Sequence, residues 1–262
     1  MNIYMKENEI SNITMPPVVL GACGLGNLCI QLQEDVKKEI IKESIAHAKG
    51  AVIFDTAGKY GAGLALESLG KCLKELGVQQ DQVIISNKLG WLRPNLTTAE
   101  PTFEPGVCKG LKHDAIQKIS YDGILECFEQ GNELLNGYTP QMVSVHEPDE
   151  YLATAKDARH AASLYDDVLG AYEALYDLKR MGKVQSIGVG AKNWKVIQRI
   201  ANDVKLDWVM IANNMAIKDH PKELLDFMQE LQKKEIAIID AAINEFDCRF
   251  AHPHLEWYNL AR

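Results

Sequence analysis

The chain has 262 residues, of which 47% are hydrophobic and 24% charged, so it is long enough for one large globular domain with a sizeable core. Its 28 Lys and Arg residues against 36 Asp and Glu residues give a net charge of −8, which argues against a nucleic-acid-binding surface. The start lacks a continuous apolar run and no apolar segment could span a bilayer, so we expect a cytoplasmic protein without membrane or nucleic-acid partners.

Short apolar runs alternate with amphipathic stretches along the chain. The apolar runs are typical of parallel strands buried on both faces, and they predict seven strands: Val18–Ala22, Ala51–Asp55, Gln82–Ser86, Met142–His146, Gln185–Val189, Trp208–Ala212 and Ile236–Ala241. The stretches between them have apolar residues at helical spacing, and they predict six helices: Val36–Ala48, Ala65–Leu76, Tyr121–Leu135, Ala162–Met181, Trp194–Val204 and Pro221–Lys234.

Regular alternation of strands and helices indicates parallel βαβ units, which form either an open doubly wound sheet or a closed barrel. The longest segment without periodicity is Gly90–Ser120, and a loop of that length is usually functional. We expect one α/β domain over residues 1–262. Because an eight-unit barrel takes about 250 residues and seven strands are predicted, the barrel is expected to be shortened at its end, with a helix around Leu255–Ala261.

Chemically active side chains lie at three successive predicted strand ends. Asp55 ends the second strand and Tyr60 follows it, Lys88 follows the third strand, and His146 ends the fourth. In a parallel barrel the carboxyl ends of the strands face one mouth, where active sites form. We therefore expect these four side chains to be neighbours.

Such a set could transfer a proton. An ammonium beside a phenol lowers the phenol pKa from its ordinary value of about 10, so Lys88 would activate Tyr60 while Asp55 holds Lys88. His146 could donate a hydrogen bond to a substrate oxygen, and the site could protonate an alkoxide while hydride moves. Each residue alone could equally be structural, and only their joint placement favours catalysis.

Several runs of the chain resemble the aldo-keto reductase superfamily over roughly residues 16–244. They are Phe54-Asp55-Thr56-Ala57 with Tyr60-Gly61, then Glu67 with Leu69-Gly70, then Ser86-Asn87-Lys88, and Leu178 to Gly190. The resemblance implies an eight-stranded (β/α) barrel that uses NADP or NAD. It also implies a catalytic tetrad, which carries over to Asp55, Tyr60, Lys88 and His146.

Two further runs, Val145–Asp149 and Gly188–Trp194, are most similar to a sugar dehydrogenase branch that includes L-fucose, L-galactose and D-threo-aldose dehydrogenases. That resemblance implies an aldose or aldehyde substrate, with Tyr60 as the base when a hemiacetal is oxidised to a lactone. Gly190-Ala191 stands where many members have the Ser-Asn pair that binds the nicotinamide. Cofactor contacts are expected at Gly24, Gly190, Asn193 and Asn213, and Trp91 is expected to line the substrate pocket.

Other interpretations remain open at this stage. The chain could be a barrel that binds a nucleotide or a partner without turnover, or an open α/β hydrolase, although it has no Gly-x-Ser-x-Gly motif. A homo-oligomer is possible. The six cysteines form no C-x-x-C pair and are interpreted as reduced thiols. We expect no bound metal, because His252 and His254 have no third ligand in view.

Overall fold

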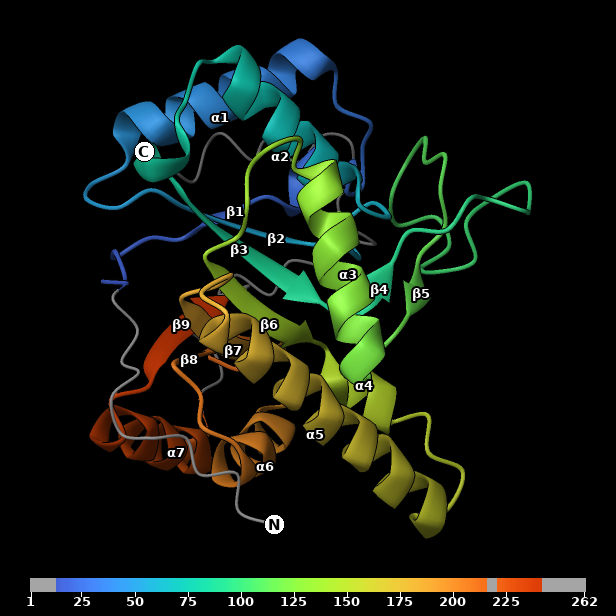
Figure 1. Ribbon diagram of the computed structural model, residues 1–262, viewed down its shortest axis with the longest axis vertical. Coiled ribbons are helices and arrows are strands. Elements are labelled where there is room, and N and C mark those ends of the chain that lie inside the picture. Colours follow the sequence, from blue (N-terminus) through green and yellow to red (C-terminus); the bar gives the residue numbers. More distant parts are fainter. Residues whose placement is uncertain (1–12, 216–220, 242–262) are drawn as a thin grey trace.

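A computed structural model describes residues 13–215 and 221–241 (Figure 1). Seven parallel strands form one curled sheet in the order β1-β2-β3-β6-β7-β8-β9. The strands are β1 Leu20–Gly21, β2 Ile53–Ala57, β3 Ile84–Leu89, β6 Met142–His146, β7 Ser186–Ala191, β8 Trp208–Ala212 and β9 Ala237–Ala241. A separate antiparallel hairpin pairs β4 Trp91–Leu92 with β5 Ile116–Gln117.

The longer helices cover the outer face of the sheet (Figure 1). They are α1 Glu34–His47, α2 Leu64–Glu75, α3 Tyr121–Leu134, α5 Ala158–Arg180, α6 Trp194–Asp203 and α7 Lys222–Lys233, with the short elements η1 Cys23–Gly26, η2 Gln80–Gln82 and α4 Pro148–Leu152. Side-chain caps set three of the helix starts, because Ser120, Asp157 and Asn193 each accept a hydrogen bond from a backbone amide of the first turn.

The sheet is buried on both faces. Outward-facing residues such as Val143, Val145 and Val189 pack against the helices. Inside the curl, Met142 and the large indole of Trp208 belong to a separate apolar cluster. A side chain on Gly188 would place its Cβ 2.3 Å from the Trp208 ring, so glycine is required there for the indole to fill the interior.

The strands predicted from the sequence are present, with shifted ends. β6 and β8 have the predicted bounds, whereas β2 and β3 both begin and end two or three residues later. Lys88 therefore lies within β3 rather than after it, which corrects the expectation. The predicted strands ended too early because polar residues at 55 and 86 to 88 interrupt the apolar runs, although these residues are buried.

Three further features were not predicted. α5 begins at Ala158, four residues earlier than expected, because Asp157 caps it. The short helix α4 was not predicted. The β4–β5 hairpin was also missed, so the segment Gly90–Ser120 is not one uninterrupted loop. The helix predicted around Leu255–Ala261 and the residues His252 and His254 lie outside the described ranges.

Among the cysteines in residues 13–215 and 221–241, one differs from the expectation. Cys23, Cys72, Cys108 and Cys127 are free thiols, as predicted. Cys29 is disulfide-bonded, so the prediction that all six are reduced is wrong. Pairing could not be predicted from spacing alone, because it depends on which thiols the fold brings together.

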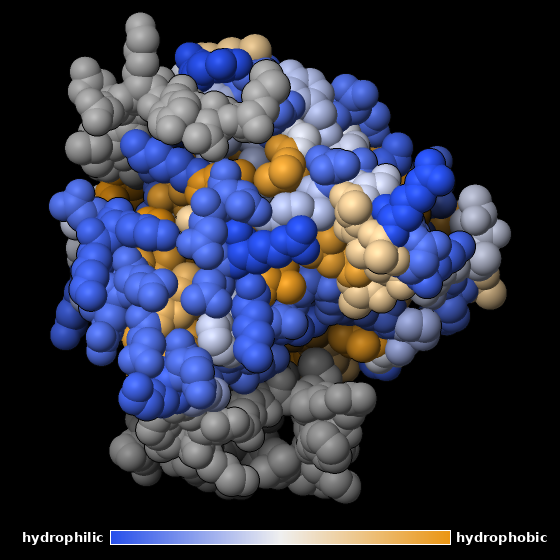
Figure 2. Space-filling view, turned by 90° about the horizontal axis from the view of Figure 1, so that it is seen from below, coloured by the Kyte–Doolittle hydropathy of each residue, from blue (hydrophilic) through white to orange (hydrophobic). Residues whose placement is uncertain are grey.

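The surface seen in Figure 2 is mostly hydrophilic, and hydrophilic residues separate the apolar areas. Large apolar side chains that reach solvent include Val18, Ile30 and Met181. Among the helices within residues 13–215 and 221–241, none has the length and apolar character needed to cross a bilayer.

Candidate active site

A buried ion pair joins β2 to β3. Lys88 donates to Asp55 through its ammonium, and the Ser86 hydroxyl donates to the other carboxylate oxygen of Asp55 at 3.1 Å. Only 2% of the Lys88 surface is exposed. Burial alone would lower the pKa of Lys88, but the Asp55 carboxylate raises it above its ordinary value. The pair therefore places a charged ammonium inside the curl of the sheet.

Gly190 on β7 leaves space for the Lys88 side chain. A Cβ at position 190 would lie 3.0 Å from Cδ of Lys88. Gly190 lies beside His146 in the register of β6 and β7. Three neighbouring strands, β3, β6 and β7, therefore set the position of the Lys88 ammonium. A larger residue at 190 would press on the lysine.

Tyr60 lies between β2 and α2, in a turn held by close backbone packing. Nζ of Lys88 is 4.7 Å from the centre of the Tyr60 ring. Burial raises the pKa of Tyr60 to about 12, although the Lys88 ammonium acts in the opposite direction. The sequence predicted that Lys88 would lower the tyrosine pKa, and it does oppose the shift, but burial outweighs it. At neutral pH Tyr60 is therefore a protonated phenol.

His146 ends β6 and contacts Tyr60. The two rings meet edge to face with their centres 5.5 Å apart. Burial, reinforced by the ammonium groups of Lys88 and Lys59, lowers the pKa of His146 well below its ordinary value, so the ring is neutral. Its Nδ1 is buried without a hydrogen-bond partner within the described ranges. A neutral imidazole beside a protonated phenol can hold an oxygen atom that is about to receive a proton.

These four side chains open onto one cavity of about 570 Å³. The predicted residues Asp55, Tyr60, Lys88, His146, Gly190 and Asn213 all line it. Other lining residues come from the first turn, from the loop between β4 and β5, and from the last strands, and they include Gly21, Cys23, Leu28, Glu104, Val107, Cys108, Met210, Ala212, Ile239 and Ala241. The cavity thus lies at the carboxyl ends of the parallel strands, where the sequence predicted a site.

Three other predicted residues lie outside the cavity lining. Trp91 packs against Phe103, with ring centres 6.4 Å apart, and Nζ of Lys59 lies 4.8 Å from its ring centre. Asn193 caps α6 through its side chain and donates its backbone amide to Asp149. Gly24 lies inside η1. Their predicted roles as cofactor or substrate contacts stay predictions.

A charged cluster at the mouth of the cavity was not predicted from the sequence. We call it the Lys59 cluster, and its members are Lys59, Glu104, Glu147, Glu150 and Lys192. The Lys59 ammonium contacts Glu104 at 2.8 Å, Glu150 at 3.0 Å and Glu147 more closely. Lys192 contacts Glu147 at 2.9 Å and Glu150 at 2.6 Å. The signal available in the sequence was adjacency, because Lys59 precedes Tyr60 and Glu147 follows His146.

Two members of this cluster have unfavourable backbone conformations. Glu104 and Glu147 have φ values of +40° and +50°, in the left-handed region that disfavours residues with a side chain. Both carboxylates reach Lys59, so contacts of the cluster offset the backbone strain. The cluster is therefore a defined structural feature of the cavity mouth.

Comparison with known proteins identifies a family for most of the chain. The sequence profile of the aldo/keto reductase family matches residues 17–243. Pyridoxal 4-dehydrogenase from Microbacterium luteolum is 24% identical, over 89% of this chain and 68% of its own length. D-threo-aldose 1-dehydrogenase from a Pseudomonas species is also 24% identical, over 80% of this chain and 60% of its own length.

Solved structures of the same family share the fold. An aldo-keto reductase from Bacillus halodurans, in its holo form, superposes with a TM-score of 0.62 at 17% identity, covering 90% of this chain and 66% of that chain. An aldo/keto reductase from Klebsiella pneumoniae, solved with NADP and acetate, has a TM-score of 0.56 at 16% identity, covering 85% of this chain and 62% of that chain. This chain spans about two thirds of the length of such relatives. The curled sheet is thus that of the family barrel, and the open doubly wound alternative is wrong.

Proposed function

Because the chain belongs to the aldo/keto reductase family, we propose that it is an oxidoreductase that uses NADP or NAD to interconvert a small carbonyl compound and its alcohol. The observation that carries the proposal is the convergence of Tyr60, Lys88 and His146 on one cavity. Asp55 holds Lys88 there. These residues come from three strands and an adjoining turn, and no requirement of packing alone explains a buried charged pair beside a phenol.

In this proposal Tyr60 exchanges a proton with the substrate oxygen. Its phenol is protonated at neutral pH, which suits it to donate to an alkoxide during carbonyl reduction. In the oxidation direction the phenolate form takes the proton, and the Lys88 ammonium favours that form. The neutral His146 ring positions the oxygen by hydrogen bonding. Asp55 acts through Lys88 and is a positioning residue.

The cavity wall formed by β7, β8 and β9 fits a nicotinamide ring. Most of its residues are small or apolar, with Gly190, Ala212 and Ala241 among them, whereas Asn213 offers an amide and Asp240 a carboxylate. Gly21 has open space where a Cβ would stand, so the lining stays wide there. We propose that Gly190 and Asn213 hold the nicotinamide end. When bound, the cofactor would supply or accept a hydride at the substrate carbon.

The substrate class that the site supports is an aldose or another small polar aldehyde. Lys59, Glu104, Glu147 and Lys192 line the same cavity as Tyr60, so several donors and acceptors face it. Such groups suit a molecule with several hydroxyls better than an apolar aldehyde. Two relatives are named as dehydrogenases of an aldose and of pyridoxal, which agrees with this class.

The test is a spectrophotometric assay with NADP or NAD and a panel of aldoses and aldehydes, in both directions. We expect turnover in the wild type and a loss of about 10³-fold in kcat for Tyr60→Phe, which removes only the hydroxyl. Tyr121→Phe is the matched control, because its hydroxyl bonds to Asp177 on the surface of α5. Cofactor binding without turnover on the panel would favour a barrel that binds nucleotide without catalysis.

A further inference from the structure

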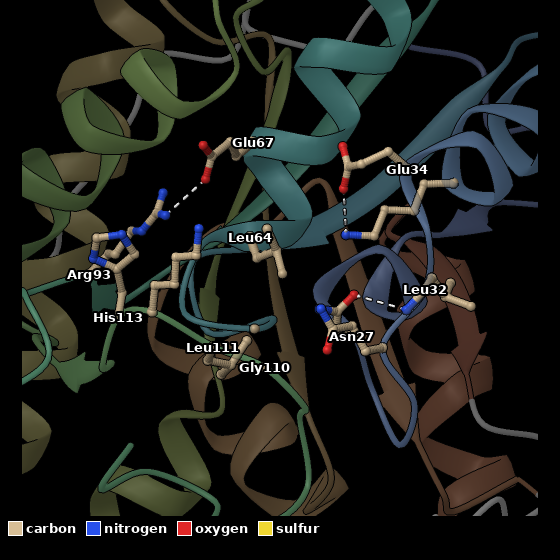
Figure 3. Close-up of a pocket in the computed structure, with 13 residues that line it drawn as sticks. Asn27, Leu32, Glu34, Leu64, Glu67, Arg93, Gly110, Leu111 and His113 are labelled. Atoms are coloured by element: carbon tan, nitrogen blue, oxygen red, sulfur yellow. Dashed lines mark hydrogen bonds and ion pairs between the residues drawn. The ribbon is translucent and has the colours of Figure 1, made fainter. Parts of the chain in front are cut away.

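A second cavity, of about 280 Å³, lies between the beginnings of α1 and α2 and the loop that joins β4 to β5 (Figure 3). We call it the α1–α2 cavity. Gly61 is the one residue that lines both this cavity and the active-site cavity. Its charged lining residues are Glu34, Lys37, Glu67, Arg93 and Lys112. No step of the proposed reaction uses it.

Positive charge is in excess around this cavity. Lys37 and Lys71 share a single carboxylate, that of Glu34, at 3.4 Å and 2.9 Å. Arg93 contacts Glu67 at 2.8 Å, as Figure 3 shows. Lys112 lines the cavity and has no ion pair within the described ranges. The three cationic side chains that line the cavity, Lys37, Arg93 and Lys112, thus outnumber its two lining carboxylates, in a chain whose net charge is −8.

One donor group at the cavity also lacks a partner. Nε of Arg93 is buried without a hydrogen bond within the described ranges. The Arg93 side chain is only 13% exposed, so water reaches little of it. Buried polar atoms are normally hydrogen-bonded. The Arg93 guanidinium donates to Glu67 through one terminal nitrogen and leaves Nε unpaired, so it can donate to a further acceptor.

Two other kinds of ligand are disfavoured by the lining. Three leucines are its only large apolar residues, so an apolar ligand would leave most of the polar wall unpaired. A metal ion would need several free carboxylates or imidazoles. Glu34 and Glu67 already pair with cations, and no metal-binding group of three residues occurs in the described ranges.

We propose that the α1–α2 cavity binds a small oxyanion, a phosphate or carboxylate group, through Arg93 and Lys112. Arginine and lysine are the side chains that bind such groups best, because each N–H forms a charge-assisted hydrogen bond to an anionic oxygen. The cavity volume exceeds that of a bare ion, so a small phosphorylated or carboxylated metabolite would fit. Apart from Gly61, the site shares no lining residue with the proposed catalytic centre.

The test is a titration of the full chain with inorganic phosphate, and separately with acetate, followed by amide shifts in NMR at low ionic strength. We expect saturable shifts at Gly61, Leu64 and residues 110–113. Lys112→Gln should raise the Kd for phosphate about tenfold, because it removes one charge-assisted contact. Gln31→Glu adds a negative charge to the lining, so this variant should also bind phosphate more weakly than the wild type does.

Two controls separate this site from general charge effects and from the active site. Lys118→Gln removes an exposed lysine that does not line the cavity, so its Kd should equal that of the wild type. Tyr60→Phe should also bind phosphate unchanged, whatever its activity. Equal weakening in Lys112→Gln and Lys118→Gln, no saturation, or shifts confined to the active-site cavity would each overturn the proposal.

Discussion

Two opposing effects determine the pKa of Tyr60. Burial raises the pKa of this phenol to about 12, and the Lys88 ammonium opposes the rise. Lys88 keeps its proton although it is buried, because Asp55 holds the pKa of Lys88 above its ordinary value. His146 stays neutral because burial and the nearby ammonium groups both lower its pKa. The set is therefore poised to give a proton at neutral pH rather than to take one.

This balance predicts different pH dependences for the two directions of reaction. Oxidation needs the phenolate, so kcat/KM should rise about tenfold per pH unit between about pH 7 and 10, below the Tyr60 pKa. Reduction needs the phenol and should stay level over the same range. Initial rates across pH check this. An oxidation rate that levels off below about pH 8 would contradict the raised pKa.

The Asp55–Lys88 pair also predicts a stability effect. Lys88→Met leaves Asp55 buried without its cation, which should lower the free energy of unfolding by about 3 kcal/mol. Adding Asp55→Asn removes the second charge, so the double variant should regain part of that loss. Urea unfolding measures both. A double variant no more stable than Lys88→Met would show that the buried charge is not the cause.

At the scale of elements, the turn that carries Tyr60 is fixed by two glycines. A Cβ on Gly61 would lie 2.3 Å from the carbonyl oxygen of Gly26, and one on Gly26 would lie 2.8 Å from the backbone of Tyr60. The short helix η1 and the turn before α2 therefore touch through their backbones. Such close approach requires glycine on both sides. It sets where the Tyr60 ring enters the cavity.

Gly61→Ala should accordingly damage activity as well as stability. Gly61 has φ +60° and no space for a Cβ, whereas Gly77 has φ +70° with nothing within 4 Å. Gly77→Ala isolates the backbone cost, about 1 kcal/mol, and should leave kcat unchanged. Gly61→Ala should cost more and lower kcat, because the turn must move. Thermal unfolding and initial rates compare the two, and equal effects would contradict the steric explanation.

At the scale of the whole molecule, the Lys59 cluster ties together the loops around the cavity mouth. Lys59 precedes Tyr60, Glu104 belongs to the β4–β5 connection, Glu147 and Glu150 follow β6, and Lys192 follows β7. The sheet brings these segments to one end. Burial would raise the pKa of Glu147, but Lys59 and Lys192 lower it below its ordinary value. The mouth is therefore held partly by charge.

A carboxylate with a lowered pKa stabilises the fold above its unfolded pKa, and this contribution is lost as pH falls through the folded one. The urea midpoint of the wild type should therefore drop below about pH 4.5. Lys59→Met leaves Glu147 with one partner, so it should be less stable at pH 7 and lose less on acidification. Midpoints from pH 7 down to about 3 check this. Parallel pH curves for the two proteins would exclude Lys59 as the cause.

Local patterning predicted the bounds of some strands correctly and misplaced the ends of the two strands that carry the buried ion pair. β6 and β8 have their predicted bounds, whereas β2 and β3 continue through Asp55 and Lys88. Burying charged residues inside a strand is unfavourable unless they pair. Their pairing partner lies on the neighbouring strand, so a pattern along one strand cannot reveal it.

Patterns along the chain predicted the alternation of strands and helices, the order of the segments and the identities of the four residues proposed for proton transfer, because periodicity and motifs are properties of neighbours along the chain. The tertiary structure alone decided that burial outweighs Lys88 at Tyr60, that Gly190 makes room for a lysine, and that Lys59 meets three carboxylates. Those outcomes depend on solvent exclusion and on distances between residues remote in sequence, which arise only when the sheet curls and its loops meet.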